Sequence, residues 1–429
     1  YMYKAYALDE LKQYGEAIRC LDASLDIDDK FARAIHIKGI VLNNLERYND
    51  AIVFFDKALE IDPKYKKSLY NKGVALMHLK QYRNAIQCCD EVLNIDSKYY
   101  YAIHNKALAL SNLKKYEEAL VWWNKELAIN PNDAWVMTDK ATTLGSLKKY
   151  EESLVWYDKA LAIKPKNIMA LNNKANVLNN FQRHEEAIVW YDKTLAIYPE
   201  NLFALNGKGV ALMFLIKRQE AMVWYDKALE INPNYVDSLT NKANILNNLG
   251  QYEEAIVWYD KAIAIDPTYV YGVNNKGSTL NALGKYAEAI IWLDKALAID
   301  PKYVAALSNK GSTLRNLGKY AESIIWLDKA LAIEPKHIPT LNNKGLALMD
   351  LGKREEAIIW FDKALAIEPR YAHALHNKGW TSMCLGKYAE AIIWYDKALD
   401  IDPKYIHSLS NKGLTLNKLE KREEAIVWY

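Results

Sequence analysis

The hydrophobic positions along the chain fall into pairs of helical stripes separated by short breaks. In residues 338–371, IPTLNNKGLALMDLGKREEAIIWFDKALAIEPRY, a first apolar stripe at helical spacing is interrupted at Gly352. A second stripe follows and ends before Pro369, which cannot continue a helix. The pattern predicts two helices joined by a short turn, a hairpin too small to bury both faces without neighbours. The two stripes consist of Leu341, Gly345, Leu348 and Leu351, and of Ala357, Ile358, Phe361, Ala364, Leu365 and Ile367.

This hairpin recurs every 34 residues without insertion or deletion, which predicts a repeat array and not a set of globular domains. Prolines mark the period at Pro63, Pro131, Pro165, Pro199, Pro233, Pro267, Pro301, Pro335, Pro369 and Pro403; Ser97 and Asp29 occupy two further points, and Pro339 lies off the grid. We therefore divide the chain, 1–429, as a single continuous array. It has a partial repeat 1–31, full repeats 32–65, 66–99, 100–133, 134–167, 168–201, 202–235, 236–269, 270–303, 304–337, 338–371 and 372–405, and a partial repeat 406–429.

Three positions of the repeat have a fixed character. The eighth and twentieth residues are small and the thirty-second is usually proline, as Gly345, Ala357 and Pro369 are in repeat 338–371. In length and in these three positions the chain resembles the tetratricopeptide repeat family. The resemblance implies an all-α fold, a right-handed superhelical α-solenoid of 34-residue helix-turn-helix repeats, in which the first helices line a concave groove.

Two positions depart from the family pattern. The seventh residue is Lys in every repeat, where the family usually has an apolar residue, and the twenty-fifth is almost always Asp, with Asn124 as an exception. We interpret them as a ladder of Lys–Asp pairs, with lysine stems along the helix interface; the alternative is that both are solvated. Trp recurs at the twenty-third position, and its spacing from small residues, as in Trp360 with Ala357 and Ala364, predicts packing and not a ligand cage.

Asparagine recurs at the sixth position, although it is a mediocre helix former. This resembles the asparagine ladder of the repeat domain of O-linked N-acetylglucosamine transferase, whose amides hold an extended peptide. A carboxamide offers a donor and an acceptor that match a peptide backbone. The alternative is that each Asn satisfies a backbone group of the neighbouring repeat. The predicted peptide-binding residues are Asn71, Asn105, Asn173, Asn241, Asn275, Asn309, Asn343, Asn377 and Asn411, with Tyr3, Ile37, Asp139 and Gly207 as exceptions.

The second position varies most among repeats, which indicates either selectivity for a ligand or free drift at an exposed site. Its large side chains could form pockets beside the asparagines. The candidate specificity residues are Tyr101, Trp135, Met169, Phe203 and Tyr271.

Composition excludes several classes of function. Lys plus Arg (56) nearly balances Asp plus Glu (53), so the charge gives no reason to expect binding to nucleic acid or an anionic membrane. No apolar run is long enough to span a bilayer. Four scattered cysteines favour a reducing, cytoplasmic location. The sequence contains no phosphate-binding loop, HExxH, GxSxG or CxxC motif, and we expect no enzyme activity, catalytic residue, metal site or cofactor.

Three functions remain in comparison. The first is an interaction scaffold that binds an extended peptide or flexible protein segment along the Asn-rich groove. The second is a structural spacer or a superhelix that self-associates end to end, because the chain stops within an amphipathic helix. The third is RNA binding, which a groove with little positive charge disfavours.

Overall fold

The computed structural model describes residues 1–428, and over that range it contains helices and no strands. Its 26 helices follow one another in consecutive pairs, one pair to each repeat. The all-α solenoid of helix-turn-helix repeats is therefore confirmed. Contacts divide the chain into two compact units, residues 1–217 and 218–429, which we describe separately.

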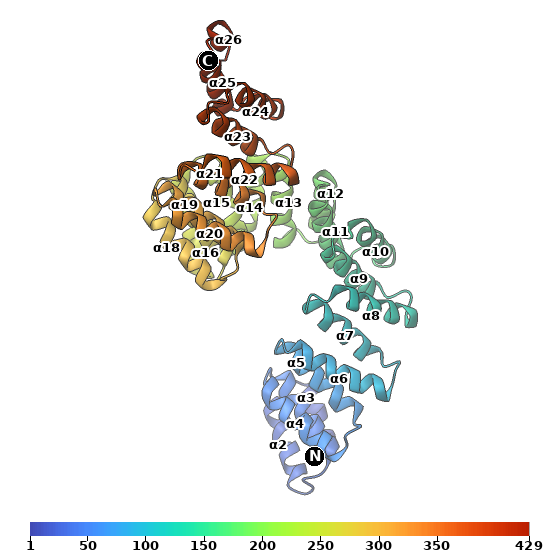
Figure 1. Cartoon of the computed structure of the whole chain (residues 1–429). Coiled ribbons are helices and arrows are strands. Elements are labelled where there is room, and N and C mark those ends of the chain that lie inside the picture. The colour runs from blue at the N-terminus through green and yellow to red at the C-terminus, as the bar shows by residue number, and fades with distance from the viewer. Residues whose placement is uncertain (429) are drawn as a thin grey trace. The chain divides into compact units, whose positions relative to one another are not determined.

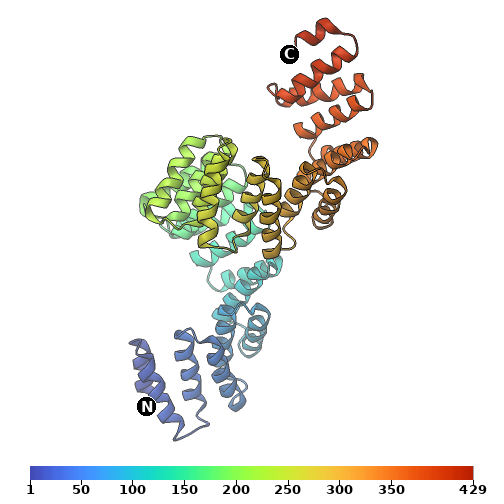
Figure 2. The same ribbon diagram turned by 90° about the vertical axis from the view of Figure 1, so that its left-hand side faces the viewer.

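In the first unit, consecutive helices lie side by side in chain order (Figure 1, Figure 2). Each second helix packs against the first helix of its own repeat and against the first helix of the next. The helices are α1 (Met2–Glu10), α2 (Tyr14–Leu25), α3 (Ala32–Asn44), α4 (Tyr48–Ile61), α5 (Lys66–His78), α6 (Tyr82–Ile95), α7 (Tyr100–Asn112), α8 (Tyr116–Ile129), α9 (Ala134–Ser146), α10 (Tyr150–Ile163), α11 (Ile168–Asn180), α12 (His184–Ile197) and α13 (Leu202–Phe214).

The second unit repeats this arrangement. Its helices are α14 (Arg218–Ile231), α15 (Val236–Asn248), α16 (Tyr252–Ile265), α17 (Val270–Ala282), α18 (Tyr286–Ile299), α19 (Val304–Asn316), α20 (Tyr320–Ile333), α21 (Ile338–Asp350), α22 (Arg354–Ile367), α23 (Ala372–Cys384), α24 (Tyr388–Ile401), α25 (Ile406–Lys418) and α26 (Arg422–Ile426).

The turn between the two helices of a repeat depends on one residue in the left-handed region. After α19 the chain reverses at Gly318, which has a φ of 78°. The amide of Gly318 donates to the carbonyl of Arg315, and the amide of Lys319 donates to that of Leu314, both at 2.9 Å. These two bonds form a Schellman motif, which satisfies the last carbonyls of the helix.

Small residues at the eighth position allow the two helices of a repeat to approach closely. A Cβ built on Gly345 would lie 2.4 Å from Cε1 of Phe361, which is fully buried. The ring therefore occupies the space that a larger eighth residue would need. The close approach expected from the small residues is confirmed here.

The seventh-position lysines join successive repeats. Lys310 forms an ion pair with Asp294 of the preceding repeat, and its Nζ lies 3.7 Å from the ring centroid of Trp326. Lys329 also lies over this ring, at 3.9 Å. The Lys310 side chain is only 9% exposed, against 51% for Asp294, so the lysine is not merely solvated.

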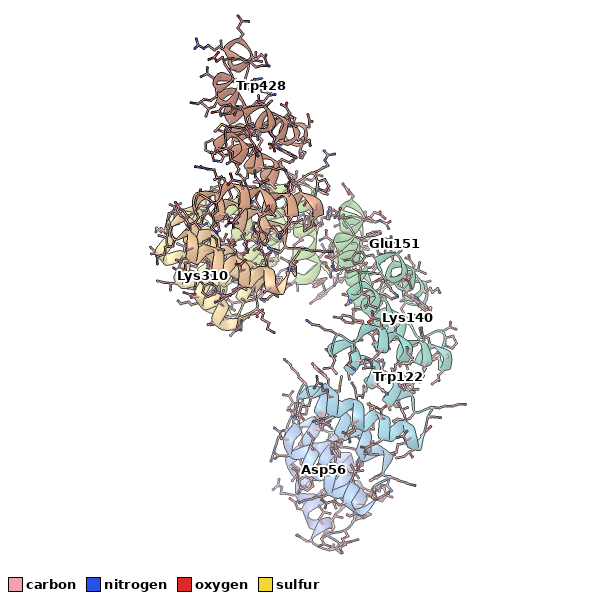
Figure 3. All side chains as sticks on the ribbon, in the orientation of Figure 1. Asp56, Trp122, Lys140, Glu151, Lys310 and Trp428 are labelled. Carbon is pink, nitrogen blue, oxygen red and sulfur yellow. The ribbon has the colours of Figure 1, made fainter. Side chains whose placement is uncertain are left out.

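The predicted Lys–Asp ladder is thus confirmed; among the residues that Figure 3 labels, Asp56, Trp122, Lys310 and Trp428 take part in the repeating Lys–Asp–Trp arrangement, whereas Lys140 meets Asn124 in place of an Asp. The tryptophans pack as expected, since Trp156 and Trp190 lie against the buried core of their repeats. The other pairs are Lys38–Asp22, Lys72–Asp56, Lys106–Asp90, Lys174–Asp158, Lys208–Asp192, Lys242–Asp226, Lys276–Asp260, Lys344–Asp328, Lys378–Asp362 and Lys412–Asp396.

Two further observations complete the fold. None of the helices formed by residues 1–428 is both long and apolar enough to cross a membrane. Cys20, Cys88, Cys89 and Cys384 are all free thiols.

Candidate functional site

The sixth-position asparagines lie on the first helices of their repeats, half-buried, where successive repeats meet. Nδ2 of Asn309 donates to Oδ1 of Asn274 at 3.0 Å, and Nδ2 of Asn377 donates to Oδ1 of Asn342 at 2.9 Å. Both acceptors are fifth-position residues of the preceding repeat. We call this arrangement, a sixth-position side chain bonded to the fifth position of the preceding repeat, the polar ladder.

Other repeats vary the polar ladder without abolishing it. Asn343 donates to Oγ of Ser308 at 3.5 Å, and Asn105 bonds the Tyr70 side chain. Asn275 and Asn173 turn instead to ninth-position residues, Asn244 at 2.9 Å and Thr142 at 3.3 Å.

The remaining predicted asparagines behave differently from one another. Asn71 donates to the carbonyl of Lys67 in its own helix at 3.0 Å. Asn241 also has an interaction partner, and Asn411 lies half-buried on α25.

Six sixth-position amides therefore connect repeats through side chains, and not through the backbone groups that the alternative interpretation proposed: those of Asn105, Asn173, Asn275, Asn309, Asn343 and Asn377. One such bond does not exhaust a carboxamide, which has two N–H donors and an oxygen that accepts two bonds. Peptide binding by these residues stays a prediction.

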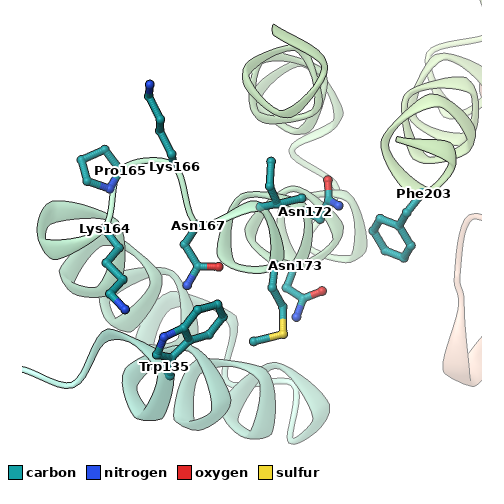
Figure 4. Close-up of a pocket in the computed structure, with 10 residues that line it drawn as sticks. Trp135, Lys164, Pro165, Lys166, Asn167, Asn172, Asn173 and Phe203 are labelled. Carbon is teal, nitrogen blue, oxygen red and sulfur yellow. The ribbon is translucent and has the colours of Figure 1, made fainter. Parts of the chain in front are cut away.

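Three of the five candidate specificity residues lie together in the first unit. Trp135, Met169 and Phe203 are the second residues of three successive repeats and line one pocket of about 980 Å³. They are 48%, 39% and 43% exposed, so a ligand could contact all three. Figure 4 shows Trp135 and Phe203 on opposite sides of this pocket, with Asn172 and Asn173 between them.

The other two candidates lie elsewhere. Tyr101 packs edge-on against Tyr99, with ring centroids 5.9 Å apart, and lines a smaller pocket of about 320 Å³. Tyr271 belongs to the second unit, where its ring lies 6.3 Å from that of Tyr269.

Two asparagines that the sequence did not single out belong to this region: Asn167 lines the pocket, and Asn201 accepts from Nδ2 of the lining residue Asn172 at 3.1 Å. Asn167 caps α11, its Oδ1 accepting from the amide of Ala170 at 3.2 Å, and Asn201 caps α13 by accepting from that of Ala204 at 2.8 Å. Both occupy the thirty-fourth position, which is Tyr in most repeats. That exchange of a large ring for a small amide is the sequence signal that could have identified them.

A buried ionisable cluster interrupts the polar ladder just before the pocket. Glu126 is fully buried, and its Oε1 lies 3.0 Å from Nδ1 of His104. Burial opposes protonation of His104, yet its hydrogen bond with Glu126 raises its pKa. Burial also raises the pKa of Asp139, which replaces the usual sixth-position Asn, to about 6. Across residues 1–428, no three His, Cys, Asp or Glu side chains are grouped so as to hold a metal ion.

Comparison with protein families gives matches along nearly all of the array. Models described as tetratricopeptide repeat match residues 32–65, 54–87, 168–199, 204–235, 236–269, 258–291, 304–337 and 337–404. A TPR repeat model matches residues 277–318, and a model of the N-terminal TPR repeats region of Psidin matches residues 74–176. No curated protein matches the chain significantly.

Solved structures with the same fold are distant in sequence. The crystal structure of the APC/C hetero-tetramer Cut9-Hcn1 contains a chain 17% identical, with a TM-score of 0.55, covering 97% of this chain and 89% of that one. A tetratricopeptide repeat protein from Parabacteroides merdae is 19% identical, with a TM-score of 0.50, covering 58% of this chain and 98% of that one. Taken with the repeat length, the small packing residues and the paired helices, these matches show that the chain belongs to the tetratricopeptide repeat family.

Proposed function

We propose that the first helices of this array bind an extended peptide or flexible segment of a partner protein. Tetratricopeptide repeat proteins generally act as non-catalytic scaffolds for protein partners. The observation that carries the proposal is the pocket in which Trp135, Met169 and Phe203 lie beside Asn172 and Asn173. It combines an apolar pocket for a side chain with amides that can bond a main chain, the two elements of extended-peptide recognition.

The amides of the polar ladder suit a peptide main chain. Each carboxamide keeps donor and acceptor capacity beyond its bond to the neighbouring repeat, and it distinguishes no side chain. One such hydrogen bond contributes about 1 kcal/mol. Useful affinity therefore requires several repeats to bind one segment at once.

Nucleic acid is the weaker candidate for this face. The pocket between Trp135 and Phe203 offers only Lys164 and Lys166 as cations. Phosphate binding requires a continuous excess of positive charge. The scaffold function therefore takes a protein segment as its ligand.

The test compares the parent with the triple variant Asn275→Ala, Asn309→Ala and Asn343→Ala on an unbiased peptide array. The matched control is Ile291→Ala, Ile325→Ala and Ile359→Ala, which alters exposed residues on the second helices of the same three repeats. Thermal melts check that each protein folds, because Ala also removes bonds between repeats.

We expect the parent and the control to bind a common set of extended peptides, and the folded asparagine variant to lose them. Equal binding by all three would refute the role of the asparagines. A parent that binds no peptide, but grows in mass with concentration in light scattering, would support the self-associating spacer instead.

A further inference from the structure

The pocket in the first unit exists because this part of the array lacks a ring that other repeats have. At the thirty-fourth position of repeat 372–405, the ring of Tyr405 lies between two successive second-position side chains. The ring centroid of Tyr405 is 5.6 Å from that of His373 and 5.9 Å from that of His407. Tyr405 thus fills the face of the first helices between these two residues.

At the pocket, two successive tyrosines are replaced by asparagines. Asn167 stands between Trp135 and Met169 in the sequence of second positions, and Asn201 stands between Met169 and Phe203. Their side chains cap the following helices, as described above, and Asn167 is only 6% exposed. The space of about 980 Å³ therefore opens where the rings are missing.

A second and independent departure from the repeat pattern, at the sixth position, leaves a hydrogen-bond acceptor unpaired beside the pocket. Asn274 and Asn342 accept from the sixth residue of the next repeat, whereas the residue that corresponds for Asn172 is Gly207. Asn172 is 7% exposed; its Nδ2 donates to Oδ1 of Asn201 at 3.1 Å, but its Oδ1 has no hydrogen-bond partner among residues 1–428.

Gly207 is fixed by close packing. A Cβ at this position would lie 2.4 Å from Cζ of Tyr191, a ring that is only 1% exposed. An asparagine therefore cannot stand there without displacing the core, and the polar ladder stops at Asn172.

The charge at the pocket has one sign. Lys164 and Lys166 line it, and no carboxylate is among its lining residues. Nζ of Lys164 lies 5.0 Å from the ring centroid of Trp135, so a cation stands directly beside the apolar wall. An acidic residue next to an apolar anchor complements this arrangement.

We propose that this pocket binds a large apolar side chain of the partner segment, next to an acidic residue that meets Lys164 or Lys166. A main-chain N–H of the segment donates to Oδ1 of Asn172 after the carboxamide turns about its soft terminal torsion, which exchanges its bond to Oδ1 of Asn201 for one to the segment. The inference rests on the proposed function and adds to it the chemical class of the bound sequence.

The test uses three short fluorescein-labelled peptides with a Gly/Ser background and measures binding by fluorescence anisotropy. One has a central Phe flanked by Asp, the second has Ala in place of Phe, and the third has Lys in place of Asp. The full chain is compared with Asn167→Tyr, which fills the pocket with the side chain that other repeats carry. This variant is expected to fold, because Tyr99 and Tyr303 also stand three residues before an alanine, as Asn167 does.

We expect the parent to bind the Phe/Asp peptide at least about tenfold more tightly than either other peptide. Asn167→Tyr should abolish the preference for Phe, and Tyr303→Asn, a control in the second unit, should leave it unchanged. The double variant Lys164→Glu and Lys166→Glu should reverse the preference, so that the Lys-flanked peptide binds more tightly.

A folded Asn167→Tyr variant that keeps the preference for Phe would overturn the pocket inference while general peptide binding stands. A parent that binds peptides on the unbiased array with no preference among the three probes would do the same. A parent that binds no peptide in either assay would overturn the proposed function together with the inference.

Discussion

The buried lysine at each junction between repeats has a carboxylate partner at every described junction but one. Lys140 meets Asn124, whose Oδ1 accepts from its Nζ at 2.6 Å, and burial lowers the pKa of this lysine. An amide neutralises no charge, so the ammonium at this junction stays uncompensated. The exception supplies a natural comparison with the other junctions.

Replacing Asn124 with Asp should stabilise this junction. The new carboxylate would pair with Lys140 as Asp294 pairs with Lys310, and we expect a gain of about 0.5–1 kcal/mol in the free energy of unfolding. Urea denaturation at neutral pH measures it. The converse variant, Asp294→Asn, should lose a similar amount; an unchanged midpoint in both would show that the pairs contribute nothing.

Buried histidines make stability depend on pH. Nδ1 of His376 lies 3.0 Å from Oγ of Ser408, and burial, reinforced by His407 and His373, lowers its pKa from 6.5 to about 4. Between these values the unfolded chain binds more protons than the folded one. The contribution of neutral His376 to the free energy of unfolding is therefore complete above the unfolded pKa and is lost as the pH falls.

We expect His376→Asn to reduce this loss by roughly 1–2 kcal/mol between about pH 7 and about pH 5. Asparagine is an acceptable substitute because Asn342 stands at the same position of the preceding repeat. Denaturation curves at both pH values measure the difference. His36, whose pKa burial also lowers to about 4, remains in the variant and should account for part of the residual pH dependence.

At the scale of helices and turns, the sequence predicted most of the structure. The break at Gly352 and the stop at Pro369 place the helix ends within two residues of those of α21 (Ile338–Asp350) and α22 (Arg354–Ile367). This accuracy has a physical basis, because the same turn and helix-end signals recur at the same positions in successive repeats. The non-glycine residues at the turn, such as Lys114, were not anticipated in the left-handed region.

The turn position should respond in opposite directions to opposite substitutions. Lys114 has a φ of 60°, so Lys114→Gly should raise the free energy of unfolding by about 1 kcal/mol. Gly318→Ala should lower the free energy of unfolding by a similar amount. No atom lies within 4 Å of the added Cβ, so the cost comes from the left-handed backbone conformation alone. Thermal unfolding of both variants checks this, and shifts of the same sign would contradict it.

A second comparison concerns helix packing. Gly15→Ala in α2 adds a Cβ with nothing within 4 Å and should be neutral or stabilising, since Ala is the better helix former. Gly345→Ala adds a Cβ 2.4 Å from Phe361 and should lower the free energy of unfolding by about 1–3 kcal/mol. Hydrogen exchange should locate the loss in α21, α22 and their direct neighbours. Faster exchange throughout the second unit would show that its repeats unfold as one cooperative body.

For the whole molecule, the sequence identified the variable second-position side chains but did not predict the pocket that some of them form. Trp135, Met169 and Phe203 were identified as a group because their position varies. The pocket between them depends on side chains that are absent, at Asn167, Asn201 and Gly207, and on the way that neighbouring repeats would have filled that space. Such an absence becomes visible only when the spacing between repeats is known. The partners of the sixth-position amides were unpredictable for the same reason.

The pocket has a consequence for how a bound segment would be positioned. A surface that repeats itself at every hairpin presents the same main-chain contacts after a shift of one repeat, so by itself it cannot determine where a segment stops sliding. The cavity between Trp135 and Phe203 removes that translational ambiguity. The same irregularity that ends the polar ladder at Asn172 would therefore set the register of the bound segment, that is, which residue of the partner faces which repeat.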